Sequence, residues 1–242
     1  TRLRGSYAQG IKEPNFDATF GLPPFTLPNP NLKPEQNRAF EAGVSQSLMR
    51  GRYSLDAIYF NNLFSDKIAF EMVSPFQGQF LNLNKALAHG AELSLSARPT
   101  RGLQLRGAYV YTSTQTLKAP AATDPLQSAG APFLRVPKHS GNLLVSYARR
   151  KFGATLGGTF LGRRTDEDFT FGLIPPVTHA AGYARFDAGG WYALNRHVTT
   201  YARLENLLNQ HYNDVVGYPG LRANFRVGMR FNIGGDRGTP TP

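Results

Sequence analysis

The stretch GAELSLSARPTRGLQLRGAYVYTS, residues 90–113, holds two runs of alternating apolar and polar side chains around a short basic turn. In the first run Leu93 and Leu95 flank Ser94, and in the second run Leu105 precedes Arg106. Successive side chains of a strand point to opposite faces, so this alternation predicts β-strands with one apolar and one polar face. Residues 53–60 and 224–233 alternate in the same way, whereas no segment shows comparable helical spacing.

The spacing of these runs predicts ten strands joined by four short turns and five long loops. The short turns are basic and fall at residues 50–52, 99–102, 149–151 and 195–197. The long segments are rich in Pro, Gly and aromatic residues and span 12–34, 64–78, 117–134, 164–179 and 210–221. Short turns on one rim and long loops on the other are typical of outer-membrane β-barrels. A soluble antiparallel sandwich alternates similarly, and it remains the alternative on pattern alone.

Aromatic residues near the predicted strand ends suit the interfacial girdles of such a barrel. They are Tyr7, Tyr53, Tyr59, Phe60, Tyr109, Tyr111, Tyr147, Tyr192 and Phe231. A membrane-spanning helix needs about 18 consecutive apolar residues, and no window of the sequence approaches that. The chain begins at Thr1 without a signal peptide, so we expect a processed chain or a piece of a longer protein.

Composition excludes several kinds of site. The 242 residues include no Cys, which excludes disulfides, thiolate metal centres and a cysteine nucleophile. The five His residues lack the spacing that places two imidazoles on one face, and no nucleotide or hydrolase fingerprint is present. The segment 163–168 contains both acidic and basic side chains. This composition favours a solvated, self-paired loop entrance, in which these charges pair with one another, over a Ca²⁺ site. We therefore predict no catalytic residues, no metal site and no cofactor.

The net charge of +11 is spread over strands and turns without a helix or compact stripe, so we expect no nucleic-acid binding. Within a barrel, the charged residues on polar strand faces would point into the lumen. These candidates for lumen or plug contact are Glu41, Glu92, Arg106, Arg203, Glu205, Arg226 and Arg230. A further basic group would sit at the short turns near anionic headgroups: Arg50, Arg52, Arg98, Arg101, Arg149, Arg150 and Lys151.

Six segments resemble, in order, the carboxy-terminal half of a TonB-dependent outer-membrane receptor. They are LRGSYAQGIKEPNF (3–16), NPNLKPEQNRAFEAGV (29–44), YFNN (59–62), NLNKALAHGAELSL (82–95), RVPKHSGNLLVSY (135–147) and RLENLLNQHYNDVVGYPGLRANFRVGMRF (203–231). The resemblance covers nearly the whole chain. It implies an all-β antiparallel barrel segment over residues 1–233, about ten strands of a barrel of about 22, followed by a polar tail at 234–242.

The family's amino-terminal plug and TonB-contacting segment have no counterpart in these residues. We therefore expect the chain by itself to form an open, strongly curved sheet with two unpaired edges. The resemblance implies a bacterial outer-membrane receptor that binds a scarce nutrient at its extracellular loops, with plug-gated passage energised by the TonB complex. A ferric siderophore, haem, a corrinoid or an oligosaccharide would be the ligand, and outer-membrane lipid, the plug and the missing strands would be partners.

The predicted long loops carry the aromatic residues that could contact such a ligand, because rings bury large areas at low entropic cost. The candidates are Phe16, Phe20, Phe25, Phe76, Phe133, Phe169, Phe171 and Tyr218. Packing of the loops on one another is the competing explanation for these rings. Two other functions remain open: a self-contained ten-strand outer-membrane pore or adhesin, closed by pairing of the first and last strands, and a soluble carbohydrate- or protein-binding sandwich.

Overall fold

The computed structural model describes residues 1–118, 128–168, 170 and 176–233; the side chains of residues 83 and 84 lie outside this description. One sheet dominates, and its path runs β1-β3-β4-β5-β6-β7-β8-β11-β12-β15. Its strands are β1 (Arg2–Lys12), β3 (Glu35–Leu48), β4 (Tyr53–Ser74), β5 (Gln77–Ala97), β6 (Leu103–Lys118), β7 (His139–Ala148), β8 (Phe152–Leu161), β11 (Tyr183–Ala193), β12 (Val198–Glu205) and β15 (Asn224–Phe231).

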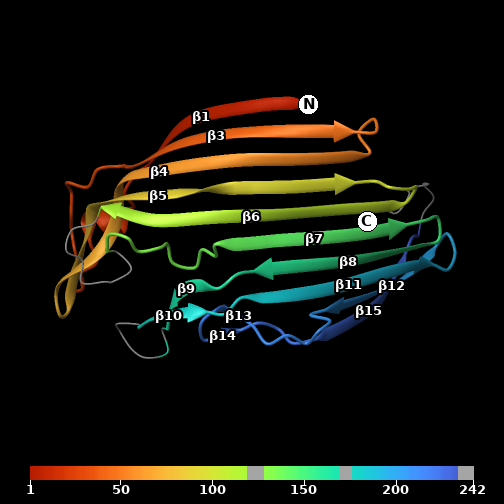
Figure 1. Cartoon of the computed structure of the whole chain (residues 1–242). Coiled ribbons are helices and arrows are strands. Elements are labelled where there is room, and N and C mark those ends of the chain that lie inside the picture. The colour runs from red at the N-terminus through yellow and green to blue at the C-terminus, as the bar shows by residue number, and fades with distance from the viewer. Residues whose placement is uncertain (119–127, 169, 171–175, 234–242) are drawn as a thin grey trace.

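These ten strands are antiparallel, and each pairs with the next one along the path. Figure 1 shows them as an open, curved sheet with the four short turns at one end. β1 and β15 form the two edges of that path. The predicted strand number, the short turns and the open sheet are confirmed. The closed ten-strand barrel required β1 to pair with β15, and the described residues do not pair in that way.

Smaller elements lie in the long loops at the other end. They are α1 (Phe16–Phe20), β2 (Thr26–Leu27), β9 (Arg164–Glu167), β10 (Val177–Ala180), β13 (Asn213–Val215) and β14 (Tyr218–Pro219). β2 adds in parallel to β5, β9 pairs with β10, and β13 pairs with β14. The described helix is too short and too polar to cross a membrane.

The prediction of a long loop at 64–78 is wrong. β4 continues to Ser74 and β5 starts at Gln77, so this segment is a strand hairpin with a tight tip. Register shifts between Phe64 and Ile68 and after Met72 interrupt the alternation, which is why the strand pattern is hard to see in the sequence. The loop before β3 supports the hairpin, since the Gln77 and Gln79 side chains donate hydrogen bonds to backbone carbonyls of that loop at 3.1 and 2.8 Å.

The register gives the sheet two chemically different faces, because directly paired residues share a face. One cross-strand row is apolar and reads Leu3, Val44, Ala57, Leu93, Tyr109, Gly141, Phe160 and Ala184. The adjacent row is polar and reads Arg2, Ser45, Asp56, Ser94, Ala108, Asn142, Thr159 and Arg185. An apolar face next to a polar face is the pattern of a barrel wall between lipid and lumen.

The apolar face is bare within the described chain. The buried hydrophobic residues of the described chain are all alanines, whereas Leu3, Phe225 and Val227 on this face are each at least 60% exposed. A soluble sandwich would bury such side chains between two sheets, so the sandwich alternative is wrong. Most of the predicted girdle lies on this face, but Phe60 does not: it pairs with Glu41 and Gly90 on the polar face. Tyr59 and Phe60 are consecutive, and only one of them can face lipid.

Candidate functional site

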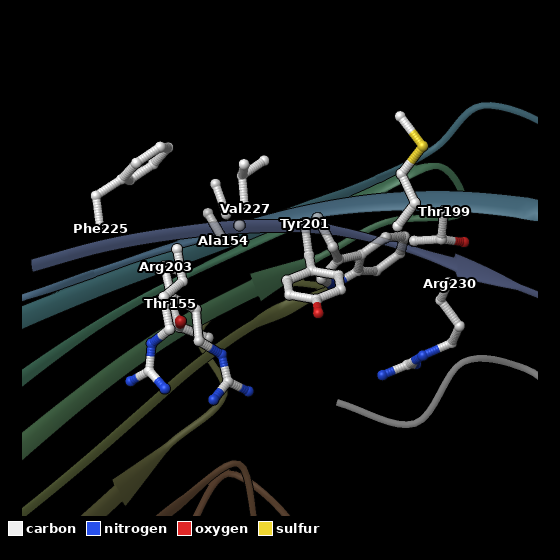
Figure 2. A pocket seen from close by; sticks show the side chains of 14 residues that line it. Ala154, Thr155, Thr199, Tyr201, Arg203, Phe225, Val227 and Arg230 are labelled. Carbon is white, nitrogen blue, oxygen red and sulfur yellow. The ribbon is translucent and has the colours of Figure 1, made fainter.

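All seven charged residues predicted to line the lumen lie on the polar face. Arg203 pairs directly with Arg226, Thr199 with Arg230, and Glu205 with Asn224. The strand register places Glu41, Glu92 and Arg106 on the same face of β3, β5 and β6. In Figure 2, the side chains of Arg203 and Arg230 lie on the opposite side of the ribbon from Phe225 and Val227. The ribbons of distant strands are visible on the arginine side, so the polar face is the concave one.

The structure brings three of these residues together at the β12–β15 edge. Glu205 accepts hydrogen bonds from the Arg226 guanidinium and, at 3.2 Å, from the Asn224 amide. Arg203 stands beside Arg226, and like charges in direct cross-strand register repel each other. Arg203 and Arg226, together with Trp191 and Tyr201, border a groove of about 850 Å³. This part of the concave face is therefore cationic and suited to an acidic or polar partner; contact with a plug stays a prediction.

Four of the predicted ligand-contact aromatics lie in the first two loop segments. Asn15 caps α1 by accepting a hydrogen bond from the Ala18 amide at 2.8 Å. Phe16 and Phe20 of that helix are exposed, and their ring centroids are 4.5 Å apart. Phe25 and Phe76 are exposed too, in the β2 loop and at the tip of the β4–β5 hairpin.

Hydrogen bonds join these two segments into one unit. The Gly78 backbone amide donates to the Phe25 carbonyl at 2.9 Å, directly before the β2–β5 pairing. The Asn29 side-chain amide donates to the Phe80 carbonyl at 2.8 Å. The exposed rings therefore stand on a hydrogen-bonded scaffold, which lowers the conformational entropy that a bound ligand would have to remove.

The other predicted aromatics behave differently. Phe133 is half-buried, with its ring centroid 6.3 Å from that of Phe64 and 4.9 Å from the Lys67 ammonium. Its backbone amide donates to Thr114 Oγ1 at 2.9 Å, so Phe133 holds its loop against β4 and β6. Tyr218 of β14 is exposed at a separate part of the rim. Phe169 and Phe171 lie outside the described residues.

A charged network that the sequence did not predict fastens three loops at this rim. Asp166 of β9 is fully buried and accepts three hydrogen bonds: from Arg135 Nε at 2.7 Å, from the Val216 amide at 2.8 Å and from the Glu167 amide at 2.9 Å. Arg164, 4% exposed, donates to the carbonyls of Asn213 and Asp214. We call Arg135, Arg164 and Asp166 the loop clasp.

The expectation of a solvated, self-paired entrance at 163–168 is therefore wrong for its central residues. Burial disfavours the Asp166 carboxylate, but the Val216 amide, the Arg135 guanidinium and the Glu167 amide outweigh that penalty and lower the pKa of Asp166. The carboxylate is fully engaged by protein donors. Among the described residues, no three metal-ligating side chains converge on one point.

A second group closes the base of the last long loop. Asn206 is buried, donates to the carbonyls of Gln210 and Leu221 at 2.9 and 3.0 Å, and accepts from the Gln210 amide at 2.8 Å. Asp187 accepts from the Asn206 amide at 2.8 Å. The Glu-Asn-Leu motif at 205–207 was the available sequence signal, but it did not reveal that Asn206 is the residue that ties both ends of the loop.

Aromatic packing connects this base to the loop clasp. The rings of Tyr183 and Tyr212 lie 4.4 Å apart, and the guanidinium of Arg164 lies 6.0 Å from the Tyr183 ring centroid. A side chain at Gly220 would place its Cβ 2.2 Å from the Tyr212 ring, so only glycine lets Tyr212 lie flat there. The Gly-Tyr-Pro-Gly segment at 217–220 therefore has a structural role at this rim.

Asn206→Ala is expected to loosen this loop without unfolding the sheet. The substitution leaves the Gln210 amide and two carbonyls without their buried partner, at about 1–3 kcal/mol for each group that water does not reach. Hydrogen exchange of the Gln210 amide should accelerate, while exchange within β12 stays slow. Leu208→Ala, at an exposed position in the same turn, is the control. Equal exchange in the two variants would contradict the assignment of Asn206 as the closing residue.

Comparison with known proteins agrees with this architecture. The family model described as "TonB dependent receptor-like, beta-barrel" matches residues 1–207. The metal-pseudopaline receptor CntO of Pseudomonas aeruginosa (strain UCBPP-PA14) is 28% identical over 209 residues, which are 82% of this chain and 28% of that protein. The iron-regulated outer membrane virulence protein of Vibrio cholerae is 28% identical over 199 residues, or 76% of this chain and 29% of that protein.

Solved structures give the same fold. The siderophore receptor PiuA of Acinetobacter baumannii superposes with a TM-score of 0.74 at 17% identity, over 95% of this chain and 33% of that one. The pyoverdine receptor FpvA of P. aeruginosa PAO1 gives 0.74 at 15%, over 96% and 34%. The chain thus spans about a third or less of these proteins. Members of the matched family are outer-membrane transport receptors that bind ligands and interact with TonB. The chain belongs to the TonB-dependent receptor-like β-barrel family, and its described strands form part of the wall of such a barrel.

Proposed function

We propose that the protein carrying this chain imports a scarce nutrient across the outer membrane, with energy delivered by the TonB complex through segments outside residues 1–242. The observation that carries the proposal is the two-faced sheet. An apolar convex face suits lipid, and a polar concave face leads to a rim of structured, aromatic-bearing loops. The reaction would be binding and gated passage, without covalent chemistry.

Among the nutrients that the family takes, a metal chelate has the most support. One relative at 28% identity is named for a metal–pseudopaline complex and another for regulation by iron. Haem, a corrinoid and an oligosaccharide are the other classes. Phe16, Phe20, Phe25 and Phe76 are the contacts that we assign to the ligand, because they are exposed on a fixed scaffold. Tyr218 would contact the ligand from a separate part of the rim, whereas Phe133 serves to pack the loop.

The lumen residues would contact the plug. Arg203, Arg226 and Arg230 present positive charge from neighbouring strands, with Glu205 already engaged by Arg226. An acidic plug surface would complement them, while Glu41, Glu92 and Arg106 would face it from β3, β5 and β6. A self-contained pore or adhesin is not favoured, because the described β1 and β15 lie at opposite edges.

Uptake of radioactive iron from the spent medium of metal-starved cells tests this function. We expect uptake to require both the gene and an intact TonB complex. Serine at positions 16, 20 and 25 together should raise the apparent Kd at least tenfold, about 1.4 kcal/mol, because it removes three exposed rings from the capture surface. Leu194→Ser, at an exposed site on the opposite rim, is the matched control. Uptake that continues without TonB would refute the proposal, and unchanged affinity in the triple variant would refute the ligand surface.

A further inference from the structure

The four short turns of the sheet form a strongly basic rim. They span residues 49–52, 98–102, 149–151 and 194–197, and they contain no Asp or Glu. Eight exposed cationic side chains define this basic rim: Arg50, Arg52, Arg98, Arg101, Arg149, Arg150, Lys151 and Arg196. The acidic residues of the chain lie in the strands, the long loops and the tail, so the charge at this end is one-sided. In a barrel of this family the short turns face the periplasm.

Backbone hydrogen bonds hold the four turns in a row. The Arg98 amide donates to the Arg52 carbonyl at 2.8 Å, and the Ala148 amide donates to the Gly102 carbonyl at 2.9 Å. The corresponding bonds at the next two turns join the Ala193 amide to the Lys151 carbonyl at 2.7 Å and the Asn232 amide to the His197 carbonyl at 2.9 Å. Neighbouring strands are about 4.8 Å apart, so successive turns stand roughly 10 Å apart along the rim.

Aromatic residues set the depth of this row relative to the bilayer. Tyr53 follows Arg52 and Phe152 follows Lys151, and both rings lie on the apolar face. Arg149 is tied to this belt, because its Nε donates to the Tyr147 hydroxyl at 2.8 Å and its guanidinium lies 5.8 Å from that ring centroid. Interfacial Tyr and Trp sit at the level of lipid headgroups. The basic rim therefore lies where phosphate groups of the facing leaflet are found.

We propose that the basic rim binds the headgroups of anionic phospholipids in the periplasm-facing leaflet, several lipids at once, and fixes the depth of this side of the barrel. Guanidinium groups match phosphate oxygens in geometry and charge. The coupling of Arg149 to a membrane-belt tyrosine favours lipid over a soluble acidic partner, which would not need the rim at headgroup depth.

Native mass spectrometry of the whole receptor in a neutral detergent, with equal phosphatidylglycerol and phosphatidylcholine, tests the proposal. We expect phosphatidylglycerol to be retained preferentially, with a preference that weakens as salt rises. Together, Arg98→Gln, Arg101→Gln, Arg149→Gln and Arg150→Gln should reduce that preference at least fivefold, because four cationic side chains near the headgroups are lost. Lysine at the same four positions should keep most of it, which separates loss of charge from misfolding.

The matched control places glutamine at four exposed basic positions on the long-loop side: 33, 85, 138 and 163. It should retain the phosphatidylglycerol preference. The proposal is overturned if the unmodified receptor prefers neither lipid, if the rim variant keeps its preference, or if the control loses it equally. Binding of soluble poly-glutamate in place of phosphatidylglycerol would overturn it in favour of an acidic polymer. The proposal would also be overturned if the receptor preferred lipid A and only the control variant lost that preference.

Discussion

Leu95→Arg is expected to lower the free energy of unfolding of the bilayer-inserted receptor by about 1–2 kcal/mol, between the penalties for Arg on the lipid face at the interface and at the midplane. Leu95 pairs with Leu55 and Gly107 on the apolar face. Along β4 and β5 it lies between the levels of Tyr53 and Tyr59, two girdle residues. The guanidinium would therefore have to reach past the level of Tyr53 to find water.

Ser94→Arg is the matched control, one residue away on the polar face. Ser94 pairs with Asp56, whose carboxylate would neutralise the new charge. Denaturant unfolding in lipid vesicles should separate the two variants by most of the predicted penalty. Equal stabilities would mean that the two faces have been assigned the wrong environments.

Asp166→Asn is expected to release the three loops held by the loop clasp. The amide nitrogen of Asn would oppose donors that now point at a carboxylate, and Arg135 would lose its charged partner. Hydrogen bonds to charged groups contribute about 1.5–3 kcal/mol each, so the protection of the Val216 amide should fall by at least tenfold in hydrogen exchange. Asp168→Asn is the control, because within the described part of the chain the Asp168 side chain accepts hydrogen bonds from Thr170 alone.

The same clasp should open in acid. A carboxylate whose pKa is lowered in the folded state stabilises that state above its unfolded pKa, and the contribution disappears as pH falls through the folded value. The pKa of Asp166 is lowered, so Val216 protection should be constant from pH 7 to 5 and decline below about pH 4. A decline that begins near pH 6 would point to another titrating group.

Local alternation was sufficient to predict the sheet. Runs such as Leu93-Ser94-Leu95 specify both the strand and its two faces, and the basic turns at 50–52 and 149–151 mark where each hairpin reverses. The β4–β5 extension was missed because residues 66–74 pair through irregular register with the start of β5, and residues 24–29, far along the chain, support that part of β5. Strand formation there depends on tertiary contacts, which a local sequence pattern does not reveal.

The loop clasp escaped prediction for the same reason. Asp166 finds Arg135 and Val216 at separations of 31 and 50 residues, and residue type alone does not distinguish the buried Asp166 from the half-buried Asp168. The aromatic candidates divide similarly. Phe16 and Phe133 look alike in sequence, yet one ring is exposed on a helix and the other packs against Phe64.

The pairing of every strand in the main path with its nearest sequence neighbours has a kinetic consequence. Contacts between near neighbours keep contact order low, and the entropy of closing each connecting loop grows only slowly with its length. The widest gap between paired strands of that path, from Lys12 to Glu35, contains only the short elements α1 and β2. The wall can therefore grow by one hairpin at a time, with each completed edge acting as the template for the next strand.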